Sequence, residues 1–152
     1  MCKRIAGEAK IREREGNWYT LLIESQQPVG SSPTVPTKQG FIMKVNIKDI
    51  MGKIVKDDIT YLLKDNTSLV HLVLSSTALH PNQSTRGHKH QGQEEVYIFV
   101  SGAGTMELDD KTINVDPGDV VLIEDGVYHR VHNPSDVDDL YFICIFEGKR
   151  NH

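Results

Sequence analysis

The part of this chain that says most about its fold is residues 87–97, GHKHQGQEEVY. Successive side chains of a β-strand point to opposite faces, so His88 and His90 would project to the same side of a strand. Their imidazoles could then converge on one ion. A carboxylate from the following strand, Glu94 or Glu95, could supply a third ligand. The stretch therefore predicts a metal site built on a β-sheet.

A second stretch, residues 118–133, reads GDVVLIEDGVYHRVHN and supplies a further histidine, His129, on a short β-like run. Three imidazoles and one carboxylate are donors that suit a divalent transition metal. We therefore predict one such ion as cofactor. Iron, manganese, nickel and zinc all accept these donors, and the order of affinities does not choose among them.

Length and composition restrict the class of protein. The 152 residues suffice for one domain with its own core. A net charge of −4 leaves no basic face for nucleic acid, and no apolar run approaches a membrane span or a signal-peptide core. Cys2 and Cys144 are unlike any disulfide or zinc framework, and Cys144 is interpreted as a small buried apolar residue. These features predict a cytoplasmic protein without nucleic-acid or membrane partners.

The first 42 residues differ from the rest, because residues 26–36 form a linker rich in proline, serine and glycine. We expect residues 1–42 to be a flexible N-terminal extension and residues 43–152 to be the organised domain. The alternative is an additional N-terminal strand that pairs with the sheet or with a partner chain.

From Lys44 onward, hydrophobic residues alternate with polar ones in short runs bounded by turn residues such as 64–66. Many short, closely spaced strands predict an all-β sandwich or barrel. Only residues 47–55 could hold a short helix. The predicted strands are 59–63, 68–75, 85–90, 95–100, 103–108, 112–115, 119–123, 127–132 and 140–147.

These two stretches resemble the two motifs of the cupin superfamily. The first motif, Gly-x5-His-x-His-x(3,4)-Glu-x6-Gly, is met by Asn82, His88, His90, Glu95 and Gly102, with asparagine in place of the initial glycine. The second, Gly-x5-Pro-x-Gly-x2-His-x3-Asn, is met by Gly118, Glu124, Gly126, His129 and Asn133, with glutamate in place of proline. Both departures fall at turn positions and not at ligands. The resemblance covers roughly residues 60–147.

The resemblance implies a double-stranded β-helix, the cupin jelly-roll barrel, with His88, His90, Glu95 and His129 holding one ion. It also implies a metal-dependent, isomerase-like enzyme acting on a small polar substrate such as a sugar, a sugar phosphate or an organic acid. Two alternatives stay open: an iron-dependent dioxygenase, and a non-enzymatic module that binds a metal or small ligand. Because a small open barrel exposes sheet edges, we also expect a homodimer.

Parity along the strands predicts further pocket residues. Gly92 indicates a turn after the two histidines, at which the parity restarts. The Glu-x6-Gly spacing of the cupin motif, counted back from Gly102, then implies that Glu95 rather than Glu94 faces inward, together with Tyr97 and Phe99. Arg86 shares the parity of His88, which makes it a candidate for binding an anionic substrate. Tyr97 and Phe99 are the other substrate-binding candidates. No catalytic residue is assigned, and Tyr97 and Glu94 are the candidates for that role.

Overall fold

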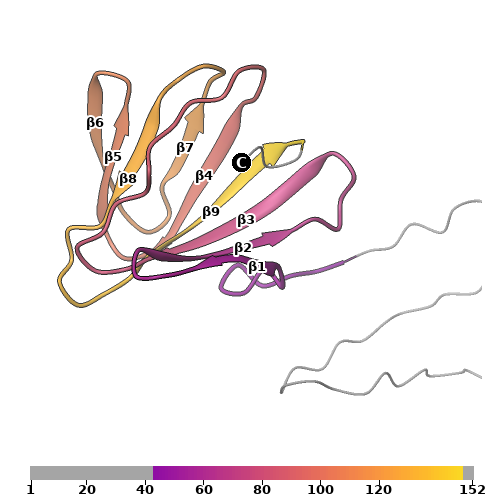
Figure 1. Cartoon of the computed structure of the whole chain (residues 1–152), viewed down its shortest axis with the longest axis horizontal. Coiled ribbons are helices and arrows are strands. Elements are labelled where there is room, and N and C mark those ends of the chain that lie inside the picture. The colour runs from indigo at the N-terminus through magenta and orange to yellow at the C-terminus, as the bar shows by residue number, and fades with distance from the viewer. Residues whose placement is uncertain (1–42, 149–152) are drawn as a thin grey trace, which may run out of the picture. The chain divides into compact units, whose positions relative to one another are not determined.

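The computed structural model describes residues 43–148, and these residues form nine β-strands and no helix (Figure 1). All the strand pairs are antiparallel, and the strands form two sheets, one of order β1-β2-β3-β9-β4-β7 and one of order β6-β5-β8. The all-β prediction is confirmed, whereas the predicted extension, residues 1–42, lies outside the described residues. The strands are β1 (Lys53–Asp57), β2 (Tyr61–Asn66), β3 (Leu72–Leu79), β4 (Glu95–Ser101), β5 (Gly104–Leu108), β6 (Lys111–Val115), β7 (Val120–Ile123), β8 (His129–His132) and β9 (Leu140–Glu147).

The core lies on the inner faces of the strands, where alternate residues are buried. On β4 the inward residues are Glu95, Tyr97 and Phe99, and the residues between them are only partly buried. The inward rings of β4 stack on β9, with Tyr97 and Phe142 centroids 5.4 Å apart. Apolar burial of this kind is the main favourable term in folding. The one carboxylate in this row is Glu95, so a charged group enters an otherwise apolar surface.

The predicted strands from residue 95 onward agree with β4 to β9 to within two residues at every end. The strands predicted at 59–63 and 68–75 correspond to β2 and β3, which lie later in the chain than predicted. β2 and β3 pair over Tyr61–Asn66 and Leu74–Leu79. Residues 64–66 therefore belong to β2, and the turn predicted there is wrong. Whether a short polar segment forms a strand or a turn depends on its hydrogen bonds and neighbours in the sheet more than on its composition.

The short helix predicted over residues 47–55 is also wrong. Asn46 and Asp49 instead make a tight turn, in which the Asn46 carboxamide accepts from the Lys48 N–H and the Asp49 carboxylate accepts from the Met51 N–H. Such side-chain bonds favour turns over helices. A Cβ on Gly52 would lie 2.6 Å from the Asp65 backbone, so this glycine lets the chain approach β2 closely.

Residues 85–90, predicted as a strand, are an irregular segment that touches β8 through two isolated bridges, Ser84 with His132 and His88 with His129. From the first bridge to the second, the irregular segment advances by four residues and β8 by three, so the pairing register shifts by one residue. Gly87 lies inside that shift with φ of 53°, a conformation that favours glycine. A bulge of this kind re-aims side chains, so the parity that linked Arg86 to His88 does not hold.

Asn82, which replaces the first glycine of the motif, has φ of 58°. Asparagine tolerates this left-handed region better than other residues with a Cβ, and its N–H donates to the Ser135 carbonyl at 2.8 Å. We expect Asn82→Gly to leave the free energy of unfolding near that of the wild type. Asn82→Val should lower it by about 1–2 kcal/mol, measured by chemical denaturation. Equal stability of the valine variant would contradict the conformational explanation.

Candidate metal centre

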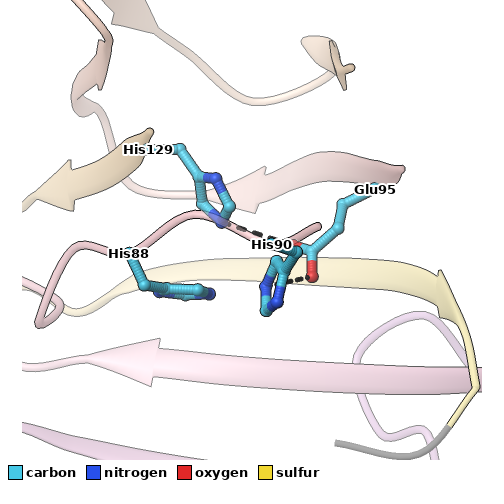
Figure 2. A group of neighbouring side chains, drawn as sticks. All are labelled: His88, His90, Glu95 and His129. Atoms are coloured by element: carbon cyan, nitrogen blue, oxygen red, sulfur yellow. Dashed lines mark ion pairs between the residues drawn. The ribbon is translucent and has the colours of Figure 1, made fainter. Parts of the chain in front are cut away.

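Four side chains from β4, β8 and the irregular segment before β4 point toward one another: His88, His90, Glu95 and His129 (Figure 2). Their ligand atoms all lie within 4.8 Å of one another. A divalent ion forms bonds of roughly 2.0–2.2 Å to imidazole and carboxylate, so ligands on opposite sides of it are roughly 4 Å apart. The spread of the four side chains is therefore close to that of a metal site.

Glu95 is the first residue of β4, and its side chain is only 5% exposed. One carboxylate oxygen, Oε1, lies 3.0 Å from Nε2 of His90, and the other, Oε2, lies 3.5 Å from Nε2 of His129. Burial raises the pKa of Glu95, but its interactions with the protonated form of His129, with the Cys144 thiol and with the protonated form of His90 outweigh that effect. The pKa is held below its ordinary value, so the group is a carboxylate at neutral pH.

His129 lies on β8 and is 2% exposed. Its Nδ1 lies 3.1 Å from the carbonyl of Val127, which can only accept, so Nδ1 carries the proton. In its neutral form the ring then directs the lone pair of Nε2 into the centre. This is the usual arrangement of a metal-ligating histidine, whose second nitrogen donates to a carbonyl or carboxylate. The backbones of His129 and His88 also exchange two hydrogen bonds, at 2.9 and 3.1 Å, which places both rings beside each other.

The Nε2 atoms of His90 and His129 are buried and have no hydrogen-bond partner. The 3.0 Å approach of His90 to Glu95 satisfies distance alone and not hydrogen-bond geometry. Buried polar atoms are almost always paired, so two unpaired nitrogens aimed at one point require an explanation. A divalent ion among the four side chains supplies it. The residues present therefore fit a metal ion.

A small cavity of about 40 Å³ adjoins the centre. One water needs roughly 10–15 Å³ on the same measure, so the cavity has room for a few waters or for a small ligand beside an ion. Its walls come from β2, β3, β4 and β9 of the six-stranded sheet and from the irregular segment before β4, and they are mostly apolar or weakly polar. The lining residues are Leu63, Ser75, Thr77, His88, His90, Gln93, Glu95, Tyr97, Phe142, Cys144 and Phe146.

The other predicted pocket residues are placed differently. Tyr97 lines the cavity, and its ring centroid lies 5.7 Å from that of His129. Phe99 is on the same face but packs one layer deeper, against Phe142, and does not reach the cavity. Arg86 and Glu94 are exposed and are not among the residues that line it. For Arg86 the reason is the bulge at Gly87.

Several residues of the site were not predicted from the sequence, and two of them make specific contacts there. Cys144, interpreted as simply apolar, is buried but donates its thiol hydrogen to Glu95 and lines the cavity. Asp125 accepts from the N–H groups of Gly92 and Gln93 at 2.6 and 3.4 Å, and so holds the turn between His90 and Glu95. Cys144 lies outside the two motifs, and Asp125 occupies a position that the second motif leaves unspecified. Both contacts join segments more than 30 residues apart, so no local pattern signals them.

Residues 76–146, which run from within β3 to within β9, match the family model described as the cupin domain. This match shows that the chain carries a cupin domain. Its two antiparallel sheets are therefore those of a cupin double-stranded β-helix, and the prediction of that fold is confirmed. The His88, His90, Glu95 and His129 cluster lies within the matched region.

Two other proteins are similar in sequence to part of this chain. An oxalate-binding protein of Thermotoga maritima is 29% identical over 94 residues, which cover 54% of this chain and 76% of the relative. An uncharacterized protein of Methanocaldococcus jannaschii is 32% identical over 59 residues, which cover 39% of this chain and 47% of the relative. The chain thus spans about half the length of this second relative.

Solved structures share the fold at lower identity. A protein from Thermus thermophilus is superposed with a TM-score of 0.61 at 16% identity, covering 72% of this cupin and 100% of that chain. An RmlC-like cupin from Shewanella frigidimarina gives 0.58 at 16% identity, covering 66% and 87%. A predicted oxalate decarboxylase from Thermotoga maritima gives 0.57 at 22% identity, covering 69% and 98%. At these identities the likeness establishes the fold alone.

Across residues 43–148, no helix has the length and hydropathy that a membrane crossing requires.

Proposed function

We propose that this cupin is a metal-dependent enzyme that acts on a small organic acid. The observation that carries the proposal is the pair of buried, unpaired nitrogens on His90 and His129, which face the Glu95 carboxylate beside a cavity. When bound, a divalent ion would polarise a carbonyl or carboxylate oxygen of the substrate. His88, His90, Glu95 and His129 would hold that ion.

The cavity favours an organic acid over a sugar phosphate. Its volume of about 40 Å³ is far below the roughly 300–1,000 Å³ of pockets that enclose drug-sized ligands. None of the described residues that line it is a lysine or an arginine. A phosphate group is usually bound by such cations or by a helix N-terminus, and the described residues form no helix. A two- or three-carbon acid, whose charge the metal centre would neutralise, suits this site.

The chain's own residues would orient such an acid and exclude water from it. The hydroxyl-bearing side chain of Thr77, on β3, lines the cavity and can donate to a substrate oxygen. Leu63, Phe142 and Phe146 supply apolar walls, which strengthen electrostatic interactions inside the site. Tyr97 is the lining residue whose phenol could exchange a proton with the substrate. An isomerisation of the acid fits this proton transfer, and an iron-dependent oxidation is the alternative.

A second candidate function is binding of a small acid without turnover. The observation that favours it is the curated relative from Thermotoga maritima, which is named as an oxalate-binding protein and is 29% identical to this chain over 94 residues. The same metal centre would serve this function. Loss of substrate over time separates the two, because a binding module leaves the acid unchanged.

Elemental analysis of protein purified without added metal, followed by calorimetric titration, tests the proposal. We expect about one transition-metal ion per chain, and binding of oxalate or a similar acid only by metal-loaded protein. Mannose 6-phosphate should bind much more weakly to the same sample. Chelator-treated protein is the matched control. Absence of metal, or equal binding of the acid before and after chelation, would contradict the proposal.

The pH dependence of metal binding gives a further prediction. Histidine ligands bind as neutral imidazoles with a reference pKa of about 6.5, so protons compete with the ion below roughly pH 6. The pKa of Glu95 lies below its ordinary value of 4.5, so the carboxylate stays charged through that range. Its contribution to stability is present above the unfolded pKa and is lost only as pH falls through the lowered folded value.

We therefore expect two separate transitions on acidification. Metal content should fall between about pH 7 and pH 5, with a decrease in Tm because a bound ion at 100 times its Kd adds about 2.7 kcal/mol. The metal-free fold should persist until the carboxylates protonate at lower pH. Dialysis across pH 4–8, followed by elemental analysis and thermal melts, measures both. A Tm that chelator does not change at neutral pH would contradict a metal-loaded site.

A further inference from the structure

The thiol of Cys144 lies inside the centre rather than in the bulk of the core. Cys144 is on β9, directly opposite Tyr97 of β4 in the ladder, and it is 6% exposed. Its Sγ lies 3.3 Å from Oε2 of Glu95 in a hydrogen bond, and it also lines the cavity. Because an ionised carboxylate can only accept, the geometry assigns the proton to sulfur.

The two oxygens of Glu95 therefore have different surroundings. Oε2 accepts from Cys144 and lies 3.5 Å from the Nε2 of His129. Oε1 makes the shorter approach to a histidine, 3.0 Å to the Nε2 of His90. A hydrogen bond on one oxygen restricts rotation of the carboxylate and leaves the other oxygen available to an ion.

We infer that Cys144 is a positioning residue that holds Glu95 through Oε2, so that Oε1 alone binds the ion. The inference rests on the proposed metal centre and goes beyond the four ligands. A carboxylate that binds through one oxygen leaves an additional coordination position for water or substrate. Residues that hydrogen-bond to a metal ligand typically contribute roughly 10–100-fold to metal affinity.

The test compares variants that remove the donor with one that keeps it. Cys144→Ala and Cys144→Val both lose the hydrogen bond, and the valine variant also keeps the site filled. Cys144→Ser retains an O–H donor at the same atom. Thr77→Val, which alters another polar residue of the cavity wall with little change of volume, is the matched control. Affinities for Zn²⁺ are measured by competition with a chromophoric chelator, and Co²⁺ reports the ligand field by its absorption spectrum.

We expect Cys144→Ala and Cys144→Val to weaken Zn²⁺ binding by roughly 10–100-fold and to change the Co²⁺ ligand-field bands. Cys144→Ser and Thr77→Val should stay near the wild type. Wild-type affinity in both donor-free variants would overturn the inference and leave the proposed function standing. So would an intense sulfur-to-Co²⁺ charge-transfer band in the wild type that is lost in Cys144→Ser, since the thiolate would then be a ligand itself. A wild-type chain that binds neither ion would overturn the inference and the proposed function together.

Discussion

Replacing Glu95 by glutamine is expected to remove the metal from the protein, whereas the same replacement at Glu94 leaves metal content unchanged. Glu95 is buried on the inner face of β4, with carboxylate oxygens 3.0 and 3.5 Å from the Nε2 atoms of His90 and His129. Glutamine keeps the volume but loses the charge. Loss of a residue that hydrogen-bonds to a metal ligand lowers the metal affinity roughly 10–100-fold, so loss of a ligand itself should lower it by more than about 100-fold.

Glu94 is a closely matched control, because it is the adjacent residue with the same side chain. It is exposed and does not line the cavity. Metal content and Zn²⁺ affinity of the two purified variants are compared, with circular dichroism to show that both fold. Metal loss in Glu94→Gln and retention in Glu95→Gln would mean that the inward face of β4 is off by one residue.

Replacing Asn133 by alanine is expected to lower the free energy of unfolding by about 2–4 kcal/mol. The Nδ2 of this buried residue lies 2.8 Å from the carbonyl oxygens of Leu79 and Asp138 and 3.1 Å from that of His80, so that its two N–H groups are shared among three acceptors. It therefore joins the end of β3 to the loop before β9. Alanine would remove this donor, and an unpaired buried acceptor costs about 1–3 kcal/mol. The His80 carbonyl would keep its hydrogen bond from the Gln83 N–H.

Chemical denaturation in the presence of chelator measures this loss without any contribution from bound metal. Asn114→Ala is the control, since Asn114 is exposed on β6 and its replacement should change stability by less than about 0.5 kcal/mol. A fall in Tm of roughly 4 °C or more per kcal/mol should accompany the change at Asn133. Equal stability of the two variants would show that the Asn133 hydrogen bonds contribute little.

The sequence alone determined the class of the fold and most of its second half. Alternation of apolar and polar residues, with turn residues between the runs, predicted β4 to β9, because these strands have one face in the core and one outside. The same alternation, restarted at Gly92, placed Glu95, Tyr97 and Phe99 on one face. The motif spacing selected four residues that the structure brings within 4.8 Å.

Tertiary structure decided what local patterns could not. The bulge at Gly87 re-aims Arg86, and it lies between two bridges to β8 that no neighbouring residue specifies. A Cβ at Gly87 would come within 2.1 Å of the Tyr128 hydroxyl, which is distant in the sequence. The helix predicted over residues 47–55 does not form, and the last of these residues instead belong to β1, which pairs with β2. The bond from Cys144 to Glu95 joins residues 49 apart, on strands adjacent only in the folded sheet. The periodicity of apolar residues along the sequence indicates which face of a strand is buried. The partners of a buried side chain depend instead on which strands are adjacent in the folded sheet.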